Sequence, residues 1–260
     1  MRKKSIKHIY GPISSWRLGR SLGIDPVYTG RGKICSFDCI YCQVGMTCKL
    51  TDRRKKFVPT AEIIEEVRSL PRVKIDYITF SGAGEPTLAK NLGRIIREIK
   101  KLRPEKIAVF TNASIMDRKD VQRDLMGADF VIAKLDSHSQ TLLGEMNKPS
   151  RKVKIENILD GIKSFKKRFK GRFALQIMFT KKNKKYANLI AELAQEIAPD
   201  EVQINTPLRH SPVKPLSQKE INRIKLFFKG LKTISVYNHA RKKKVKPLNR
   251  HDIIKRRGAT

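Results

Sequence analysis

The sequence Cys35-Ser-Phe-Asp-Cys39-Ile-Tyr-Cys42 places three thiols in one short loop. The gaps of three and two residues let the sulfurs surround one corner of an iron-sulfur cluster, which thiolates hold. The remaining cysteine, Cys48, follows after five further residues, so a closed four-thiolate zinc site is the alternative. A disulfide is not expected, because nothing near the N-terminus resembles a secretory signal. The sequence therefore predicts a reducing, cytoplasmic compartment.

The charge of the chain points to a polyanionic partner. The 260 residues carry 57 lysines and arginines against 24 aspartates and glutamates, a formal net charge of +33. A hydrophobic content of 40% is enough for a full core, and no apolar stretch approaches the length of a membrane span. A thermophilic surface is the competing interpretation, but that adaptation enriches lysine and glutamate together. The excess of bases favours nucleic acid as the partner, and no membrane is expected.

Two segments concentrate the basic residues, at 151–185 and at 241–257. Such blocks bind phosphates by releasing counterions. For the first block, the alternative is the solvated outer face of a helix, because its isoleucines, leucine and phenylalanine recur at helical spacing. The second block has few apolar residues and is expected to become ordered on its partner.

The rest of the chain alternates strand-like and helix-like runs, which predicts repeated βα units and a parallel sheet. Runs rich in β-branched and aromatic residues predict strands at 75–80, 106–111, 129–134, 173–179 and 201–205, with a sixth at 20–25. Amphipathic runs predict helices at 60–69, 88–102, 118–125, 153–169, 184–197 and 217–229. Thr60 and Ser217 are the candidate N-caps, the second with Glu220 as its capping-box acid.

The cysteine run resembles the hallmark of the radical S-adenosylmethionine (SAM) superfamily, Cys-x3-Cys-x2-Cys with an aromatic residue before the last cysteine, here Tyr41. The resemblance implies that Cys35, Cys39 and Cys42 hold a 4Fe-4S cluster whose fourth iron stays open to chelate SAM. It also implies an α/β fold, an open partial (β/α)6 barrel. We expect a lead-in at 1–19, the radical SAM core at 20–230 and a basic C-terminal extension at 231–260.

A glycine-rich segment follows the strand predicted at 75–80 and runs Ser81-Gly-Ala-Gly-Glu-Pro-Thr-Leu88. Glycines let the backbone approach a ligand closely, although a plain strand-to-helix turn has the same composition. The segment resembles the Gly-Gly-Glu motif that contacts the SAM amino group in this superfamily. The residues that the resemblance assigns to cofactor binding are Gly82, Ala83, Gly84, Glu85, Asn112 and Tyr41. For Asn112, which ends the next strand, a turn or helix cap is the alternative.

Two polar residues end the strand predicted at 129–134. Lys134 and Asp136 share side-chain parity, so both should face the same side of the sheet and line the substrate site as catalytic residues. An internal salt bridge is the alternative. Together with Met146-Asn-Lys-Pro149, they resemble a pair of motifs in wyosine-synthase-like radical SAM proteins.

Three arginines are candidate anion ligands. Arg209 follows the strand predicted at 201–205, and it lies in a polar, basic segment at the strand terminus. Arg17 and Arg20 lie in the segment that leads into the cysteine loop, where they could grip a phosphate or the SAM carboxylate.

The resemblance implies a radical SAM enzyme, in which an external one-electron donor reduces the cluster and SAM is cleaved to a 5'-deoxyadenosyl radical. The wyosine-type relatives act on transfer RNA, and the positive charge independently fits RNA as the substrate. Residues 1–34 contain no cysteine for the second cluster of those synthases, so a different RNA modification is expected. The alternatives are a protein- or peptide-modifying radical SAM enzyme, a glycyl-radical activase, and a non-enzymatic nucleic-acid-binding protein with a structural metal site.

Overall fold

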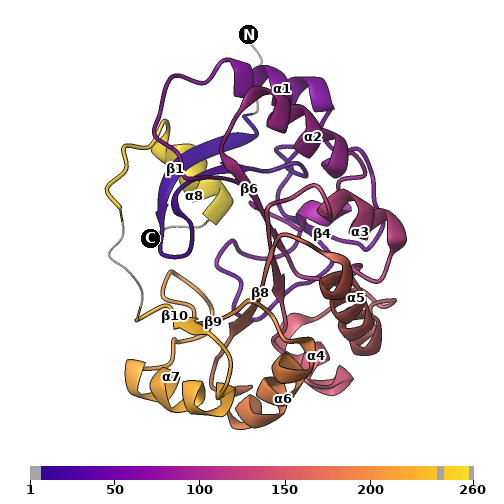
Figure 1. The fold of residues 1–260 in the computed structure, drawn as a ribbon, viewed down its shortest axis with the longest axis vertical. Coiled ribbons are helices and arrows are strands. Elements are labelled where there is room, and N and C mark those ends of the chain that lie inside the picture. Colours follow the sequence, from indigo (N-terminus) through magenta and orange to yellow (C-terminus); the bar gives the residue numbers. More distant parts are fainter. Residues whose placement is uncertain (1–6, 239–242, 258–260) are drawn as a thin grey trace.

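The computed structural model describes residues 7–238 and 243–257, in which a curled eight-stranded sheet carries helices along its outer face (Figure 1). The strand order is β1-β2-β5-β6-β7-β8-β9-β10, and only β1 pairs antiparallel. The strands are β1 (Ile9–Ser15), β2 (Gly19–Ile24), β5 (Tyr77–Phe80), β6 (Lys106–Thr111), β7 (Phe130–Lys134), β8 (Arg172–Met178), β9 (Glu201–Asn205) and β10 (Thr233–Ser235). Two short strands, β3 (Ile34–Cys35) and β4 (Lys49–Leu50), pair separately.

The helices turn apolar stripes towards the sheet, as in α5, where the isoleucines and Phe165 predicted as a stripe are buried. The α-helices are α1 (Thr60–Arg68), α2 (Leu92–Leu102), α3 (Lys119–Leu125), α4 (Gln140–Asn147), α5 (Ile155–Arg168), α6 (Ala187–Ile197), α7 (Gln218–Lys225) and α8 (Arg250–Arg257). Short 3-10 turns are η1 (Pro86–Leu88), η2 (Lys184–Tyr186) and η3 (Leu226–Phe228). Within the described ranges, no helix combines the length and apolarity needed to cross a bilayer.

The predicted α/β fold, an open partial barrel of parallel strands, is confirmed. All six predicted strands and all six predicted helices are present, with ends shifted by a few residues and with 3-10 turns at three helix ends. The capping box of Ser217 and Glu220 is present, whereas α1 begins after Pro59 and Thr60 is its first residue. Strands β1 and β10 and helices α4 and α8 are additional to the prediction.

The segment predicted as a basic extension from residue 231 contributes to the sheet and to its edge. Strand β10 pairs in parallel with β9, and α8 packs against β1. Arg256 of α8 is 2% exposed, stacks 3.7 Å over the Tyr28 ring and forms a 3.4 Å ion pair with the buried Asp25. The last helix is therefore docked on its own chain. Residues 1–6, 239–242 and 258–260 of the predicted lead-in and extension lie outside the described residues.

The inner face of the curled sheet has an apolar base and a polar upper layer. The base is a small cluster around Leu18, which the turn between β1 and β2 inserts against Ala108, Phe130, Ile132 and Ala174. One layer towards the carboxyl ends, Lys134, Gln176 and Gln203 are register partners on β7, β8 and β9. Alternation along each strand thus places polar side chains at the end of the half-barrel where the loops carry the candidate site.

A substitution at Leu18 tests whether the β1–β2 turn closes the base of the half-barrel. Replacing this buried leucine by alanine removes its contacts and leaves a cavity, so we expect Leu18→Ala to lower the free energy of unfolding by about 2–5 kcal/mol. Urea unfolding followed by circular dichroism measures the loss. Leu102→Ala, at the exposed end of α2, is the matched control and should stay within about 0.5 kcal/mol. Equal effects of the two variants would contradict a closed base.

Candidate functional site

The cysteine loop lies across the carboxyl ends of the parallel strands. Its backbone is bonded on both sides: Glu85 N–H donates to the Ile34 carbonyl at 3.1 Å, and Ile40 N–H donates to the Met146 carbonyl at 3.0 Å. Glu85 follows β5, whereas Met146 belongs to α4, which follows β7. The loop therefore spans the strand ends from β5 to β7, where the active sites of parallel α/β barrels are built.

Each of the three thiols has an N–H donor beside it. Asn112 Nδ2 lies 3.6 Å from Cys35 Sγ, and Asn147 Nδ2 lies 3.4 Å from Cys39 Sγ. The third donor is the ammonium group of the buried Lys33, 3.0 Å from the sulfur of the last cysteine in the run, Cys42. Donors of this kind favour thiolates and tune a cluster bound to them, so the surroundings fit metal-bound sulfur.

Burial opposes ionisation of two of the thiols, those of Cys35 and Cys39. It raises the pKa of Cys35 to about 12, against the smaller lowering by Lys33, and it also raises the pKa of Cys39. A thiol in this position ionises when a cation shares its charge, which is what iron ligation provides. The buried loop is suited to holding a cluster and poorly suited to reactive free cysteines.

The fourth cysteine takes no part in this arrangement. Cys48 is exposed, and its sulfur packs against Gly32. Across residues 7–238 and 243–257, no three Cys, His, Asp or Glu side chains come close enough together to surround one metal ion. A cubane cluster takes each thiolate on a different iron and so accepts sulfurs that are farther apart. The geometry of the described thiols thus differs from the closed zinc site that the sequence left open.

The glycine-rich loop after β5 is placed by two close approaches. A side-chain Cβ at Gly84 would lie 1.9 Å from the Ile34 carbonyl oxygen, and one at Gly82 would lie 2.2 Å from a carboxylate oxygen of Asp25. The same Asp25 oxygen accepts the backbone N–H of Ala83 at 2.8 Å. Only glycine fits at the two positions, so their composition is explained by packing against the cysteine loop and β2.

Glu85 ties the loops after β5 and β6 together. Its buried carboxylate accepts from the Thr87 backbone N–H, from the Thr111 hydroxyl at 2.7 Å and from the Asn112 backbone N–H at 2.7 Å. Burial raises the pKa of Glu85, and these hydrogen bonds act in the opposite direction. Asn112 also donates to the Ser36 hydroxyl at 2.8 Å, beside the first cysteine. Glu85 and Asn112, two of the residues predicted to bind SAM, therefore lie beside Cys35 and Ser36, whereas Tyr41 lies with Asp136 and Asn147.

Lys134 and Asp136 form the internal ion pair that was the alternative interpretation of this segment, and the pair belongs to a larger network. Lys134 Nζ lies 3.2 Å from Asp136 Oδ1, while Tyr41 donates its hydroxyl proton to the other carboxylate oxygen. Asn147 Nδ2 lies 2.8 Å from the Tyr41 hydroxyl and 2.9 Å from Asp136 Oδ2. Since the same nitrogen reaches Cys39, the network connects the second thiol to the polar layer of the half-barrel. Burial and the Asp136 charge raise the pKa of Tyr41 well above its usual value.

The arginines predicted as anion ligands separate into two places. Arg209 lies at the site end, where its Nη2 donates to the Gln43 side chain at 2.7 Å, one residue after Cys42. Arg17 reaches the half-barrel from the β1–β2 turn and stacks 5.5 Å from the Phe110 ring. Arg20 forms a 2.6 Å ion pair with Asp76 at the amino end of β5. Its role is therefore structural, and it lies away from the site.

For two residues of the site, the contact with a thiol could not be predicted from the sequence. Lys33 is one of 57 basic residues, and only its position two residues before Cys35 distinguishes it. Asn147 is part of a predicted motif, but its contact with Cys39 depends on the left-handed turn at Lys148 that ends α4. That turn places the segment after α4 along the cysteine loop, where Ser150 N–H donates to the Ser36 carbonyl at 2.9 Å.

Comparisons with known proteins agree with this geometry. The sequence model of the radical SAM superfamily matches residues 31–194. A UPF0026 protein of Synechocystis sp. is 42% identical over 207 residues, which are 79% of this chain and 77% of the relative. Streptococcus suis SuiB bound to S-adenosylmethionine has a TM-score of 0.60 at 14% identity and covers 79% of this chain, which spans 48% of SuiB. Archaeal TYW1 gives 0.56 at 16%, covering 82% of this chain and 72% of TYW1. At such identities these structures show the fold alone.

Serine substitutions test which thiols hold the metal. Cys35→Ser, Cys39→Ser and Cys42→Ser each remove one ligand, so we expect each to lose most of the cluster absorbance and bound iron after anaerobic reconstitution. Cys48→Ser is the matched control, because Cys48 is exposed and stands apart from the N–H donors, and it should keep wild-type iron content. Loss of iron in Cys48→Ser, with retention in any of the other three, would contradict this assignment.

Proposed function

The chain belongs to the radical SAM superfamily and to its UPF0026 family, and we propose that this enzyme modifies RNA. Enzymes of the superfamily use a 4Fe-4S cluster and SAM as cofactors and need an external electron donor. When bound, these cofactors supply a 5'-deoxyadenosyl radical that abstracts hydrogen from the substrate. The contribution of the protein is to bind, to orient and to exclude water.

We assign the cofactor contacts to the residues around Cys35. Cys35, Cys39 and Cys42 would hold three irons, as their N–H donors support. The backbone of residues 82–84 has no side chain larger than a methyl group and would contact SAM closely. Glu85, whose carboxylate already accepts from Thr87, Thr111 and Asn112, would position the two loops around SAM. Asn112 would bind a polar group of SAM, and Tyr41 would stand on the substrate side of the cluster.

Lys134 and Asp136 are our candidates for the residues that position the substrate and move its proton. Lys134 Nζ is buried and makes no well-directed hydrogen bond with the described residues, although it lies near Asp136. An ammonium group with unused donors in a polar lumen can donate to a substrate oxygen or nitrogen. The Asp136 carboxylate accepts from the Met178 N–H at 2.7 Å and lies 3.2 Å from that ammonium, which it holds in place.

RNA as the substrate is supported by positive charges around the mouth of the half-barrel that are not paired with carboxylates. Lys181 and Lys185 follow β8, and Lys148 and Arg151 lie along the cysteine loop; all four are exposed. None of them forms an ion pair with a carboxylate in the part of the chain that the structure describes. Basic residues around an active-site mouth fit a phosphate backbone that leads into the site.

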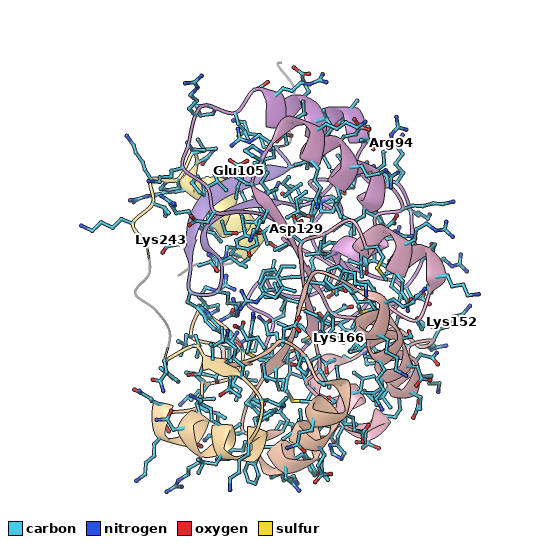
Figure 2. All side chains as sticks on the ribbon, viewed as in Figure 1. Arg94, Glu105, Asp129, Lys152, Lys166 and Lys243 are labelled. Atoms are coloured by element: carbon cyan, nitrogen blue, oxygen red, sulfur yellow. The ribbon has the colours of Figure 1, made fainter. Side chains whose placement is uncertain are left out.

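Two of the basic residues on α5 have acidic partners. Lys163 and Lys166 on α5 pair with Glu196 at 2.6 Å and Asp200 at 2.7 Å. Figure 2 labels Lys166 beside α5, and for these two lysines of segment 151–185 the ion pairs favour the solvated-helix interpretation. We therefore do not assign these two paired lysines to the proposed RNA contact.

Removing the lysine charge from the lumen should separate cofactor chemistry from turnover. We expect Lys134→Gln to reconstitute with wild-type iron content and to lower the rate of substrate modification by about 10²–10⁴-fold, the usual contribution of a positioned acid or base. Product formed in a single turnover, measured by mass spectrometry of digested RNA, gives this rate. Lys106→Gln, at the exposed amino end of β6, is the control. A rate within twofold of wild type would remove Lys134 from the mechanism.

Salt-dependent binding of bulk transfer RNA, with release of 5'-deoxyadenosine, tests the proposed substrate. RNA should stimulate 5'-deoxyadenosine formation by the reduced enzyme, and binding should weaken steeply as salt rises. The double variant Lys181→Ala/Lys185→Ala should lower the slope of log affinity against log salt by roughly 1–2.

The matched control is Lys163→Ala/Lys166→Ala, in which both lysines are already paired on α5. We expect a smaller change in slope there. Formation of 5'-deoxyadenosine that RNA does not stimulate would keep the enzyme class and reject RNA, and a peptide substrate would then be examined.

A further inference from the structure

Three arginines from distant parts of the sequence converge in the half-barrel. Arg17 comes from the β1–β2 turn, Arg209 from the loop after β9, and Arg257 from the last helix, α8. Arg209 Nη1 donates to the Arg257 carbonyl, which joins the loop to the helix. Burial together with repulsion from Arg257 and Arg209 lowers the pKa of Arg17 to about 9, and burial with the Arg257 charge lowers that of Arg209 to about 10.

The contacts of these arginines are neutral. With its amide oxygen turned towards Arg17, the orientation that satisfies both groups, Gln176 accepts from Nε and Nη2 at 3.0 Å. Arg209 donates to the Gln43 amide oxygen. The guanidinium of Arg257 has no hydrogen-bond acceptor among the residues that the structure describes. Stacking of Arg17 on Trp16, 4.0 Å from the ring centre, fixes the plane of its guanidinium without neutralising it.

Three buried carboxylates of the half-barrel that could neutralise these arginines are already paired with other cations. These ion pairs are Asp25 with Arg256, Asp136 with Lys134, and Glu201 with Arg172. Within the described ranges, none of the three converging arginines forms an ion pair with a carboxylate. Glu201 attracts Arg17 but is engaged by Arg172, so three partly buried cations that repel one another cost free energy that a bound anion would offset.

The three arginines lie next to residues that we assign to the reaction. Gln176, which holds Arg17, is the register partner of Lys134 on the neighbouring strand. Gln43, which holds Arg209, directly follows Cys42. An anion bound between the arginines would therefore place the group attached to it beside Lys134 and the third thiol.

The fork-shaped guanidinium group matches the oxygens of a phosphate, to which it donates two parallel hydrogen bonds. We propose that Arg17, Arg209 and Arg257 form a phosphate-binding site in the half-barrel that holds a phosphate of the substrate. This rests on the proposed function and adds to it how the reacting nucleotide is held. The phosphate would come from the RNA backbone or from a free nucleotide.

Helix α8 is part of this site because its docking delivers Arg257. The preceding residue, Arg256, anchors the helix through Asp25, Tyr28 and the backbone carbonyl of Lys7. The two consecutive arginines thus have different roles. Arg256 holds the helix on the fold, and Arg257 would supply a ligand to the proposed site.

Inorganic pyrophosphate is the probe, titrated calorimetrically into the anaerobically reconstituted full-length enzyme at about 0.2 M salt, where contacts of exposed charges are largely screened. We expect saturable binding of one pyrophosphate per chain. Arg17→Gln, Arg209→Gln and Arg257→Gln should each weaken it about 10–100-fold, the usual effect of losing hydrogen bonds to a charged group. Arg209→Lys, which keeps the charge and loses the fork, should retain part of the affinity.

Arg94→Gln on α2 is the matched control and should bind as wild type does. Figure 2 shows Arg94 on the opposite side of the molecule from Lys243, which precedes α8. Iron content and melting temperature of each variant establish that the fold is retained. Equal binding by all variants, or none by the wild type, would overturn the proposed site.

Competition then identifies the source of the phosphate and separates this proposal from RNA modification. If transfer RNA displaces pyrophosphate, both proposals are supported. If only nucleoside triphosphates displace it, the phosphate site stands and RNA is rejected as substrate. If RNA stimulates 5'-deoxyadenosine release while pyrophosphate never binds, the RNA proposal stands and the arginine site is overturned.

Discussion

The close contact between the cysteine loop and the glycine-rich loop is the constraint on which the site depends. The Ile34 carbonyl accepts from Glu85 N–H and occupies the space that any side chain at position 84 would need. This approach seats Cys35 beside Asn112, at the end of the neighbouring strand. Because parallel strands bring their carboxyl ends to one edge, a single backbone contact sets the first thiol against the loops of two strands.

The central strands can be predicted from the sequence because they are buried on both faces and therefore read as continuous apolar runs. The elements at the edges lack this signal. Strand β1 contains Gly11 and Pro12, and β10 has three residues, so neither stands out by composition. Helix α8 is dominated by basic residues and is held by one buried arginine, Arg256, rather than by an apolar stripe. An ion pair of this kind has no periodicity that a sequence could reveal.

The candidate site divides in the same way. The thiols, the glycines and the pair of Lys134 and Asp136 follow from motif spacing and strand parity, since both are local properties. The donors at Cys39 and Cys42 come from residues whose contacts depend on tertiary structure, Asn147 through the end of α4 and Lys33 through the fold of the loop. The overall positive charge is visible in the sequence, but the distinction between paired lysines on α5 and unpaired ones at the mouth requires the structure.

The buried carboxylate of Asp25 contacts two separate segments of this basic chain. One of its oxygens accepts the Ala83 N–H of the glycine-rich loop, and the same oxygen lies 3.4 Å from Arg256 of α8. The loop after β5 and the C-terminal helix are thus held by a single buried group, so the arrangement of each favours that of the other.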